Sequence, residues 1–132
     1  MIVTFPGAVT VDSLTVIPGP GGTASLSDAP AFIGSNEIPV SLTNVSDAQT
    51  LTITLHEVSD GTTSNDVTLR VSLLLGDTTA NGSVNASDIA LTKAQSGQAV
   101  SASNFRTDVN ANGSINSSDI SLVKSRSGTA LP

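Results

Sequence analysis

Oxygen-bearing side chains recur at fixed spacing in two twelve-residue stretches of this chain, residues 77–88 and 108–119. Each stretch begins and ends with Asp, has Gly at its sixth position, and carries Asp, Asn, Thr or Ser at positions 1, 3, 5, 7, 9 and 12. Ca²⁺ takes about six to eight hard oxygen ligands, and a loop supplies them from alternate residues when a glycine at position 6 makes the sharp turn. The spacing therefore predicts two calcium-binding loops.

The predicted ligands share their loop positions in both copies, with side-chain oxygens at positions 1, 3, 5, 9 and 12 and a backbone carbonyl at position 7. They are Asp77, Thr79, Asn81, Ser83, Asn85 (through water) and Asp88 in the first loop, and Asp108, Asn110, Asn112, Ser114, Asn116 and Asp119 in the second. The four acids of residues 77–132 all stand at position 1 or 12, so each loop offers two carboxylates to one Ca²⁺. Two departures from the usual pattern predict weak sites suited to extracellular calcium: Thr79 stands in place of Asp or Asn, and position 12 is Asp in place of Glu. The first loop is expected to be the weaker site.

The two loops belong to an internal duplication. Residues 75–97 align with residues 106–128 at an offset of 31 positions, with 13 identities in 23. Two Asn-Gly turns in a Ser- and Asn-rich chain could mimic one loop by chance, but repetition at fixed spacing argues against chance. Each loop leads into a helix start that ends at a Ser-Gly pair, as a glycine C-cap does. Val84 and Ile115, at position 8, are expected to point inward and to pair across the two loops.

A calcium loop followed by a single helix, duplicated and without an entering helix, resembles the dockerin module of bacterial extracellular and cell-surface proteins. The resemblance covers residues 76–128. It implies two Ca²⁺ ions, an antiparallel pair of loop-helix units related by a pseudo-twofold axis, and non-covalent assembly, usually on a cohesin-type β-sandwich. It also implies that the partner contacts the two residues before each final loop acid and a basic residue about five positions beyond it. These residues are Ala86, Ser87 and Lys93 in one copy and Ser117, Ser118 and Lys124 in the other.

The first 75 residues carry a different pattern, in which apolar residues alternate with Ser and Thr at a period of two. Runs such as residues 51–55 and 67–71 predict half-buried strands. Turn-forming segments separate the runs, at residues 17–22, 28–30, 44–47 and 59–61. About six or seven short strands fit this length, which predicts an antiparallel, Ig-like β-sandwich, complete or lacking a strand, since seven strands usually take about 100 residues. Pro39 cannot donate to a strand ladder, so its run is expected at a sheet edge.

Charge marks the boundary between the two patterns. Residues 1–76 hold seven acids and one base, whereas residues 77–132 hold four of each. We therefore expect a mainly β chain with a small α part, divided into a β-sandwich domain of residues 1–75 and a dockerin-like calcium-binding domain of residues 76–132. The first part also resembles the sandwich segment that precedes dockerin-like tails in large bacterial surface proteins.

Composition argues against several functions. With five Lys and Arg residues and a net charge of −6, the chain lacks the clustered positive charge that binding to nucleic acids or anionic membranes requires. No apolar run is long enough for a transmembrane helix, and no Cys is present for a disulfide or a thiol nucleophile. The sequence has a single histidine, His56, and no Gly-x-Ser-x-Gly motif, so catalysis is not expected. We expect His56 to be a solvent-facing residue of a strand. Asn44, in a predicted turn, is the expected acceptor if the protein carries N-glycans.

Two non-catalytic functions remain. The first is an extracellular or cell-surface structural protein that packs head-to-tail with copies of itself into a fibre or array, because an incomplete sandwich with an exposed edge can accept a strand from another chain. The alternative is a tether, in which the dockerin-like part of a larger secreted protein docks on a cohesin-like receptor. The assembly state of the isolated chain separates the two functions.

Overall fold

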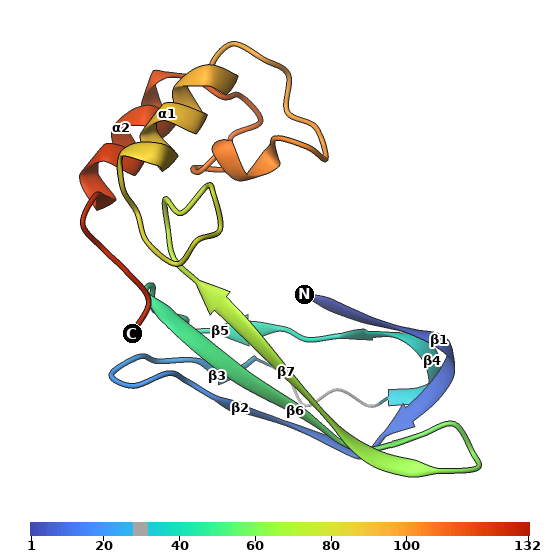
Figure 1. Ribbon diagram of the computed structural model, residues 1–132. Coiled ribbons are helices and arrows are strands. Elements are labelled where there is room, and N and C mark those ends of the chain that lie inside the picture. Colours follow the sequence, from blue (N-terminus) through green and yellow to red (C-terminus); the bar gives the residue numbers. More distant parts are fainter. Residues whose placement is uncertain (28–31) are drawn as a thin grey trace. The chain divides into compact units, whose positions relative to one another are not determined.

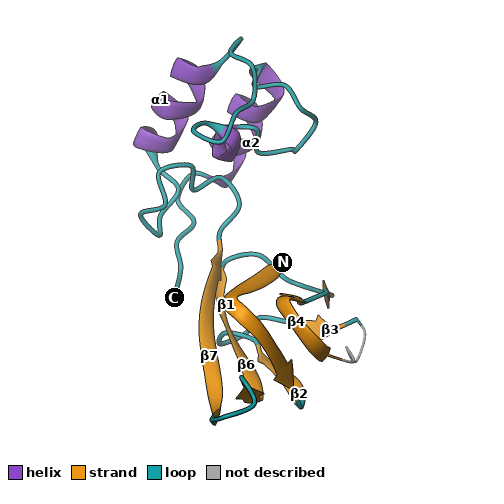
Figure 2. Ribbon diagram, turned by 90° about the vertical axis from the view of Figure 1, so that its right-hand side faces the viewer, coloured by secondary structure: helices purple, strands orange, loops and turns teal. Residues whose placement is uncertain are grey.

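The computed structural model describes residues 1–27 and 32–132 (Figure 1). The chain divides into two compact units, Met1–Ser72 and Leu73–Pro132. Figure 2 shows that strands make up the first unit and that two α-helices with their loops make up the second. The mainly β class with a small α part is therefore confirmed. The turn expected at residues 28–30 lies outside the described residues.

The described residues of the first unit form seven strands: β1 (Ile2–Val11), β2 (Ser13–Ile17), β3 (Ser25–Leu26), β4 (Phe32–Pro39), β5 (Leu42–Thr43), β6 (Gln49–Ser59) and β7 (Ser64–Leu73). Hydrogen bonding joins five of them in the order β2, β6, β1, β4, with β7 also paired to β6. Strands β3 and β5 form a separate antiparallel pair. The alternation of apolar and hydroxyl residues therefore does form antiparallel strands, while the Ig-like sandwich stays a prediction.

The core of this unit is centred on β6, because that strand is paired on both sides. Its inward residues Leu51, Ile53 and Leu55 are completely buried. The other buried aliphatic residues described in this unit lie on β1, β2 and β4 and in the segment after β4, namely Val9, Val11, Leu14, Ile38 and Val40. Each such side chain contributes about 1.5–3 kcal/mol of hydrophobic stabilisation relative to an exposed one.

Pro39 lies in an edge strand, as expected. It ends β4, which is the last strand in the described order, and it stands opposite Ile2 of β1. The next residue restores the hydrogen bonding that Pro39 cannot make: the Val40 N–H donates to the carbonyl of Met1 at 2.8 Å, and the terminal amine of Met1 donates to the carbonyl of Val40 at 2.8 Å.

One buried polar side chain organises the turns of the first unit. Gln49 is completely buried, and its amide nitrogen donates to the carbonyls of Thr23 and Ser46 at 2.8 and 2.7 Å. Its amide oxygen accepts from the Gly19 N–H at 3.1 Å. A side chain at position 22 would collide with this amide, which explains the glycine there. Gln49, the first residue of β6, therefore stabilises the turn predicted over residues 17–22 by these hydrogen bonds.

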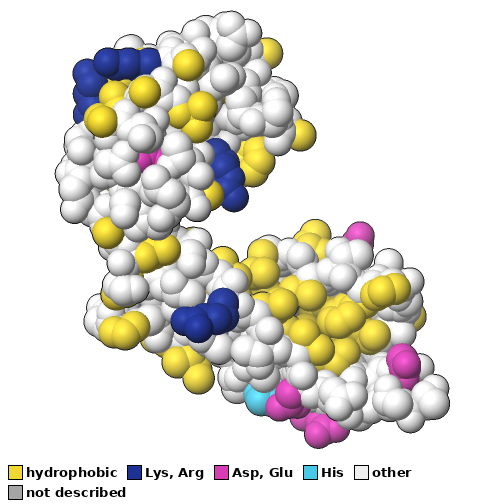
Figure 3. Space-filling view, viewed as in Figure 1, with side chains coloured by type: hydrophobic (Ala, Val, Ile, Leu, Met, Phe, Trp, Pro, Cys, Tyr) yellow, Lys and Arg dark blue, Asp and Glu magenta, His cyan; other side chains and the backbone are white. Residues whose placement is uncertain are grey.

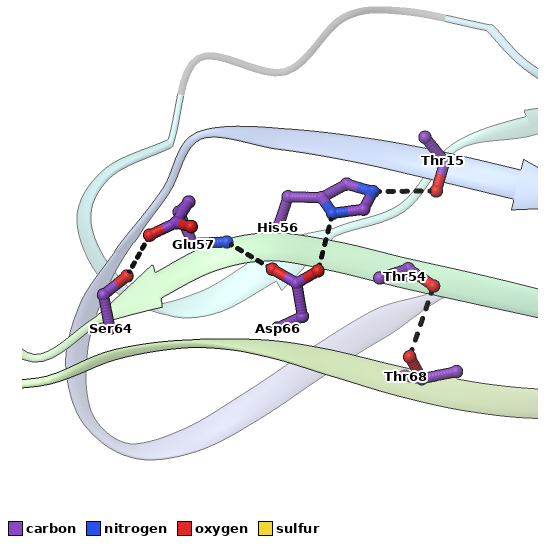
Figure 4. Close-up of polar contacts among 7 residues, drawn as sticks. All are labelled: Thr15, Thr54, His56, Glu57, Ser64, Asp66 and Thr68. Carbon is purple, nitrogen blue, oxygen red and sulfur yellow. Dashed lines mark hydrogen bonds and ion pairs between the residues drawn. The ribbon is translucent and has the colours of Figure 1, made fainter.

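Polar side chains form cross-strand pairs on the outward face of β2, β6 and β7 (Figure 4). His56 contacts the Thr15 hydroxyl through Nε2 at 3.0 Å and the Asp66 carboxylate through Nδ1 at 2.9 Å. The hydroxyls of Thr54 and Thr68 lie 3.3 Å apart further along the same face. The side chains of His56 and Asp66 are 32% and 51% exposed, so this histidine is solvent-facing as expected, and the pairs tie three neighbouring strands together.

The second unit contains α1 (Ala86–Gln95), the short 3-10 helix η1 (Phe105–Thr107) and α2 (Ser117–Arg126). Both α-helices begin with an Asn cap and a capping box, and glycines in the left-handed conformation, Gly97 and Gly128, follow their ends. The predicted helix starts and glycine ends are confirmed, whereas η1 had no clear signal in the sequence. In the part of the chain that the structure describes, no helix has the length and apolar character needed to cross a membrane.

Candidate metal centre

The first acid of each twelve-residue loop closes the loop on its own backbone. Asp77 accepts from the N–H groups of Asn81 and Gly82 at 3.1 and 2.8 Å. Asp108 accepts from the equivalent groups of Asn112 and Gly113 at 3.1 and 2.9 Å. The glycines have φ values of +82° and +83°, which is the left-handed turn that position 6 was expected to require.

The last acid of each loop is completely buried and sits in the first turn of the following helix. Asp88 accepts from the N–H groups of Thr79 and Asn85, both at 2.9 Å. Asp119 accepts from the N–H groups of Asn110 and Asn116 at 3.2 and 2.9 Å. Each carboxylate therefore ties the start of its loop to the start of its helix.

The environment of Asp88 favours the ionised carboxylate. Burial raises the pKa of this group, but the hydrogen bonds from the backbone of Thr79 and Asn85 and from the Thr79 hydroxyl outweigh burial and hold the pKa below its ordinary value. Among the described residues, no Lys or Arg lies within ion-pair distance of the four loop carboxylates. Within the described part of the chain, the loop carboxylates therefore have no direct cationic partner.

The remaining predicted ligands lie on the same loops and make local hydrogen bonds. At position 5, the side-chain oxygens of Asn81 and Asn112 each accept from the N–H two residues ahead at 2.9 Å. At position 9, those of Asn85 and Asn116 accept from the helix N–H groups of Ser87 and Ser118 at 2.8 Å. The position 9 residues thus cap the helices, and their part as ligands stays a prediction.

Position 3 differs between the two loops. The Thr79 hydroxyl donates to Asp88 Oδ1 at 2.8 Å. The Asn110 side chain instead accepts from the Asn112 N–H at 3.1 Å and donates to the Ser118 hydroxyl at 2.8 Å. The two loops therefore present different oxygen donors at position 3, and the weaker first loop stays a prediction.

The donor set of each loop fits Ca²⁺. Carboxylate, amide and carbonyl oxygens are the hard ligands that this ion takes, and the buried Asp88 and Asp119 have no cationic partner among the described residues. In the described part of the chain, no group of three or more His, Asp or Glu side chains gathers at one point, because each loop supplies only two carboxylates. Low ligand charge favours weak binding of a kind suited to extracellular calcium.

The backbone of position 8 in each loop is hydrogen-bonded to the segment that follows the other helix, and the pairing of the two position 8 side chains stays a prediction. Val84 and Ile115 are buried, as expected. The Val84 N–H donates to the carbonyl of Thr129 at 2.8 Å, after α2, while the carbonyl of Ile115 accepts from Gly97 at 2.8 Å, after α1. Each loop is therefore paired with the segment that follows the other helix.

Two features of the loops were missed from the sequence. Ala80 and Ala111, at position 4, have φ values of +58° and +54°, although alanine gives no local signal for the left-handed conformation. Thr78, at position 2 of the first loop, is buried, and its hydroxyl donates to the backbone carbonyl of Asp88 at 3.3 Å. The alignment of the two copies could have shown position 4 to be shared, but not its conformation.

The partner-contacting residues implied by resemblance are exposed on the two helices. They are Ala86, Ser87, Lys93, Ser117, Ser118 and Lys124. Both lysines stand in the last helical turn, where the positive charge also interacts favourably with the helix dipole. Ser118 differs from its counterpart because its hydroxyl donates to the Asn116 side chain at 2.8 Å, within the helix cap.

The family model described as the dockerin type I domain matches residues 75–126. No curated protein and no solved structure matches the chain. The matched residues contain both loops and both helices, so this part of the chain is similar to dockerin type I domains. Such domains bind calcium and are non-catalytic modules of protein–protein assembly.

Proposed function

We propose that the Leu73–Pro132 unit is a calcium-stabilised docking module that binds a cohesin-like β-sandwich domain of another protein. The observation that carries this proposal is the pair of matching loops, each with a buried terminal carboxylate, within the residues that match the dockerin type I domain. The chain then acts as a non-catalytic tether. The match favours this function over head-to-tail packing into a fibre or array, which stays a prediction from the sequence.

Calcium has a structural part in this proposal. Two ions would be held, one by the six predicted ligands of each loop, and they would balance the four carboxylates that have no cationic partner among the described residues. Metal binding to such loops contributes directly to folding, because the ligands are brought together only in the folded chain. A weak site is saturated where calcium is abundant, which supports a location outside a bacterial cell or on its surface.

The exposed residues of α1 and α2 would form the surface that meets the partner. Ser87 and Lys93 lie on α1, and Ser117, Ser118 and Lys124 lie on α2. Their similar positions on the two helices follow from the duplication. Hydroxyl and ammonium groups at these positions suit a partner surface rich in hydrogen-bond acceptors and acidic groups.

Calorimetric titration of the full chain with a panel of purified cohesin domains tests the proposal. Binding is expected in millimolar calcium and lost in EGTA, and the double variant Asp108→Ala, Asp119→Ala should lose it in calcium as well. The matched control Asp12→Ala, Glu37→Ala removes two exposed carboxylates from the first unit and should bind normally. Cohesin binding that persists in EGTA, or a loop variant with unchanged calcium binding and melting, would contradict the calcium assignment.

A second variant separates docking from calcium binding. Lys93→Ala with Lys124→Ala should weaken cohesin binding at least about tenfold, because it removes exposed charge on both helices, while calcium binding stays unchanged. Absence of binding to every cohesin domain tested, with calcium binding intact, would count against the docking function and leave the metal site standing.

A further inference from the structure

Strand β7 has one unpaired edge in the part of the chain that the structure describes. It pairs with β6 on one side, and no described strand pairs with it on the other. Its inward residues Val67, Leu69 and Val71 are only half-buried, whereas those of the neighbouring β6 are completely buried. Figure 3 shows a broad apolar patch on this strand-rich unit.

Apart from the charged side chains of Asp66 and Arg70, the edge of β7 lacks the usual protection. Proteins commonly shorten an edge strand, bend it with a bulge or place proline in it, because a row of free N–H and C=O groups pairs readily with another strand. Strand β7 runs for ten residues, from Ser64 to Leu73, and contains neither proline nor glycine. It therefore offers backbone hydrogen bonds and a half-exposed apolar face to an added strand.

The charges on β7 identify the strand that fits. Arg70 is the single basic residue of the Met1–Ser72 unit, which has seven acids, and it is exposed on β7 four residues from Asp66. If β7 pairs antiparallel with β7 of a second copy so that Thr68 faces Thr68, Arg70 of each copy lies opposite Asp66 of the other. The same register sets Val67 opposite Leu69 on the inward face, because side chains alternate between the two faces.

We propose that two copies of this chain pair through their β7 edges, in this register, to form a two-fold symmetric dimer with one continuous sheet. Such an interface uses the same patch on both copies, so each favourable contact occurs twice. Two Arg70–Asp66 pairs flank the central Thr68 pair on the outward face, and Val67 and Leu69 of the two copies cover each other on the inward face.

Asp66 is held in position to accept the arginine. Its Oδ1 accepts from the Glu57 N–H at 3.0 Å and its Oδ2 lies 2.9 Å from His56 Nδ1, which fixes the carboxylate on the outward face (Figure 4). The side chain is 51% exposed, so it is still open to a guanidinium from outside. The dimer does not depend on the proposed docking function, but it would present two docking modules together and so strengthen attachment to a surface carrying several receptors.

Sedimentation equilibrium of the full chain in millimolar calcium tests the dimer by charge exchange. In the Arg70→Asp variant, the new acid of each copy faces Asp66 of the other copy, so two repulsive pairs replace two attractive ones. This change should raise the dimer dissociation constant at least about tenfold. The double variant Asp66→Arg, Arg70→Asp restores opposite charges and should restore dimerisation. Lys93→Asp makes the same change in net charge on the second unit and should leave the dimer intact. Circular dichroism checks that each variant is folded.

Cysteine cross-linking tests the register independently, because the natural chain contains no Cys. Thr68→Cys should form a disulfide-linked dimer under mild oxidation, since this position faces itself, whereas Ser72→Cys faces Ser64 of the other copy and should not. The proposal is overturned if the chain stays monomeric up to about 0.5 mM. The open edge of β7 would then be expected to pair with a strand from a different protein. A dimer whose affinity is unchanged by Arg70→Asp, or equal cross-linking of both cysteine variants, overturns it as well.

Discussion

The loop carboxylates each act on more than one part of the structure. Asp77 and Asp108 accept from the backbone around the position 6 glycine, and Asp88 and Asp119 join the start of a loop to the start of a helix. These hydrogen bonds fix the positions of the carboxylate oxygens within each loop. All four acids of residues 77–132 stand at these positions, where each would also supply charge to the proposed metal.

The pKa of Asp66 gives a pH-dependent prediction. The Glu57 N–H is the largest cause that lowers this pKa below the ordinary 3.8, and hydrogen bonding and charge from His56 lower it further. The resulting stability is complete above the ordinary Asp pKa and is lost as the pH falls through the lower folded value. Carboxyl ¹³C titration should show Asp66 protonating at lower pH than an exposed Asp. His56→Ala should raise this pKa only in part, and a return to the ordinary value would contradict the role of the Glu57 amide.

Gln49 gives a second prediction for a single residue. Gln49→Ala removes a completely buried side chain and leaves the Gly19 N–H and the Ser46 and Thr23 carbonyls without it, so the unfolding free energy of the first unit should fall by about 3 kcal/mol. Urea unfolding measures the change. Gln98→Ala, at an exposed glutamine of the second unit, should change stability by less than about 0.5 kcal/mol. Equal effects of the two substitutions would show that the turns do not depend on Gln49.

At the scale of elements, the second unit is stabilised by pairing between each loop and the segment that follows the other helix. The segment after α2 pairs with the first loop, through an antiparallel bridge between Ser83 and Ala130. The segment after α1 pairs with the second loop, through a bridge between Ala99 and Ser114. Order in either loop therefore stabilises the end of the other copy, and the two loop-helix copies form one structural unit.

Leu131→Pro tests this pairing. The Leu131 N–H donates to the carbonyl of Gly82 at 3.0 Å, and proline removes that donor. Loss of one such hydrogen bond should weaken calcium binding at the first loop by about threefold to tenfold and leave the second loop almost unchanged. Amide NMR signals of Gly82 and Gly113 report the two loops separately during a calcium titration. Leu131→Ala keeps the N–H and is the control; an equal effect from that variant would assign the change to the side chain.

At the scale of the whole molecule, the two compact units depend on different interactions. The Met1–Ser72 unit has a core of aliphatic residues centred on β6. The Leu73–Pro132 unit buries fewer large aliphatic residues, among them Val84, Ile115 and Val123, and also buries two loop carboxylates. Its folded state should therefore depend more on a bound cation.

Calcium removal should act on one unit only. EGTA should abolish the helical signal of the second unit, because the loop carboxylates are then uncompensated, while the β signal and urea midpoint of the first unit change little. Circular dichroism and amide NMR in calcium and in EGTA make the comparison, with magnesium as the control ion. A second unit that stays folded without calcium, with the same melting temperature, would show that its hydrogen bonds suffice.

Much of the structure follows from local patterns in the sequence. The loops, their glycine turns, the helix starts and ends, the alternating strands and the edge position of Pro39 all depend on residues a few positions apart. Backbone geometry alone links such residues: a glycine supplies the left-handed turn, an Asn caps a helix, and a period of two separates the faces of a strand.

The tertiary structure alone decided which segments meet. No local pattern indicates that each loop pairs with the segment after the other helix, that Gln49 holds the turn at Gly19, or that β6 is central while one edge of β7 is unpaired. These contacts join residues far apart in the chain and depend on how all the elements pack. The sequence by itself therefore determined the kind of site and its donors, and packing determined what supports the site and which edge of the strand-rich unit is open.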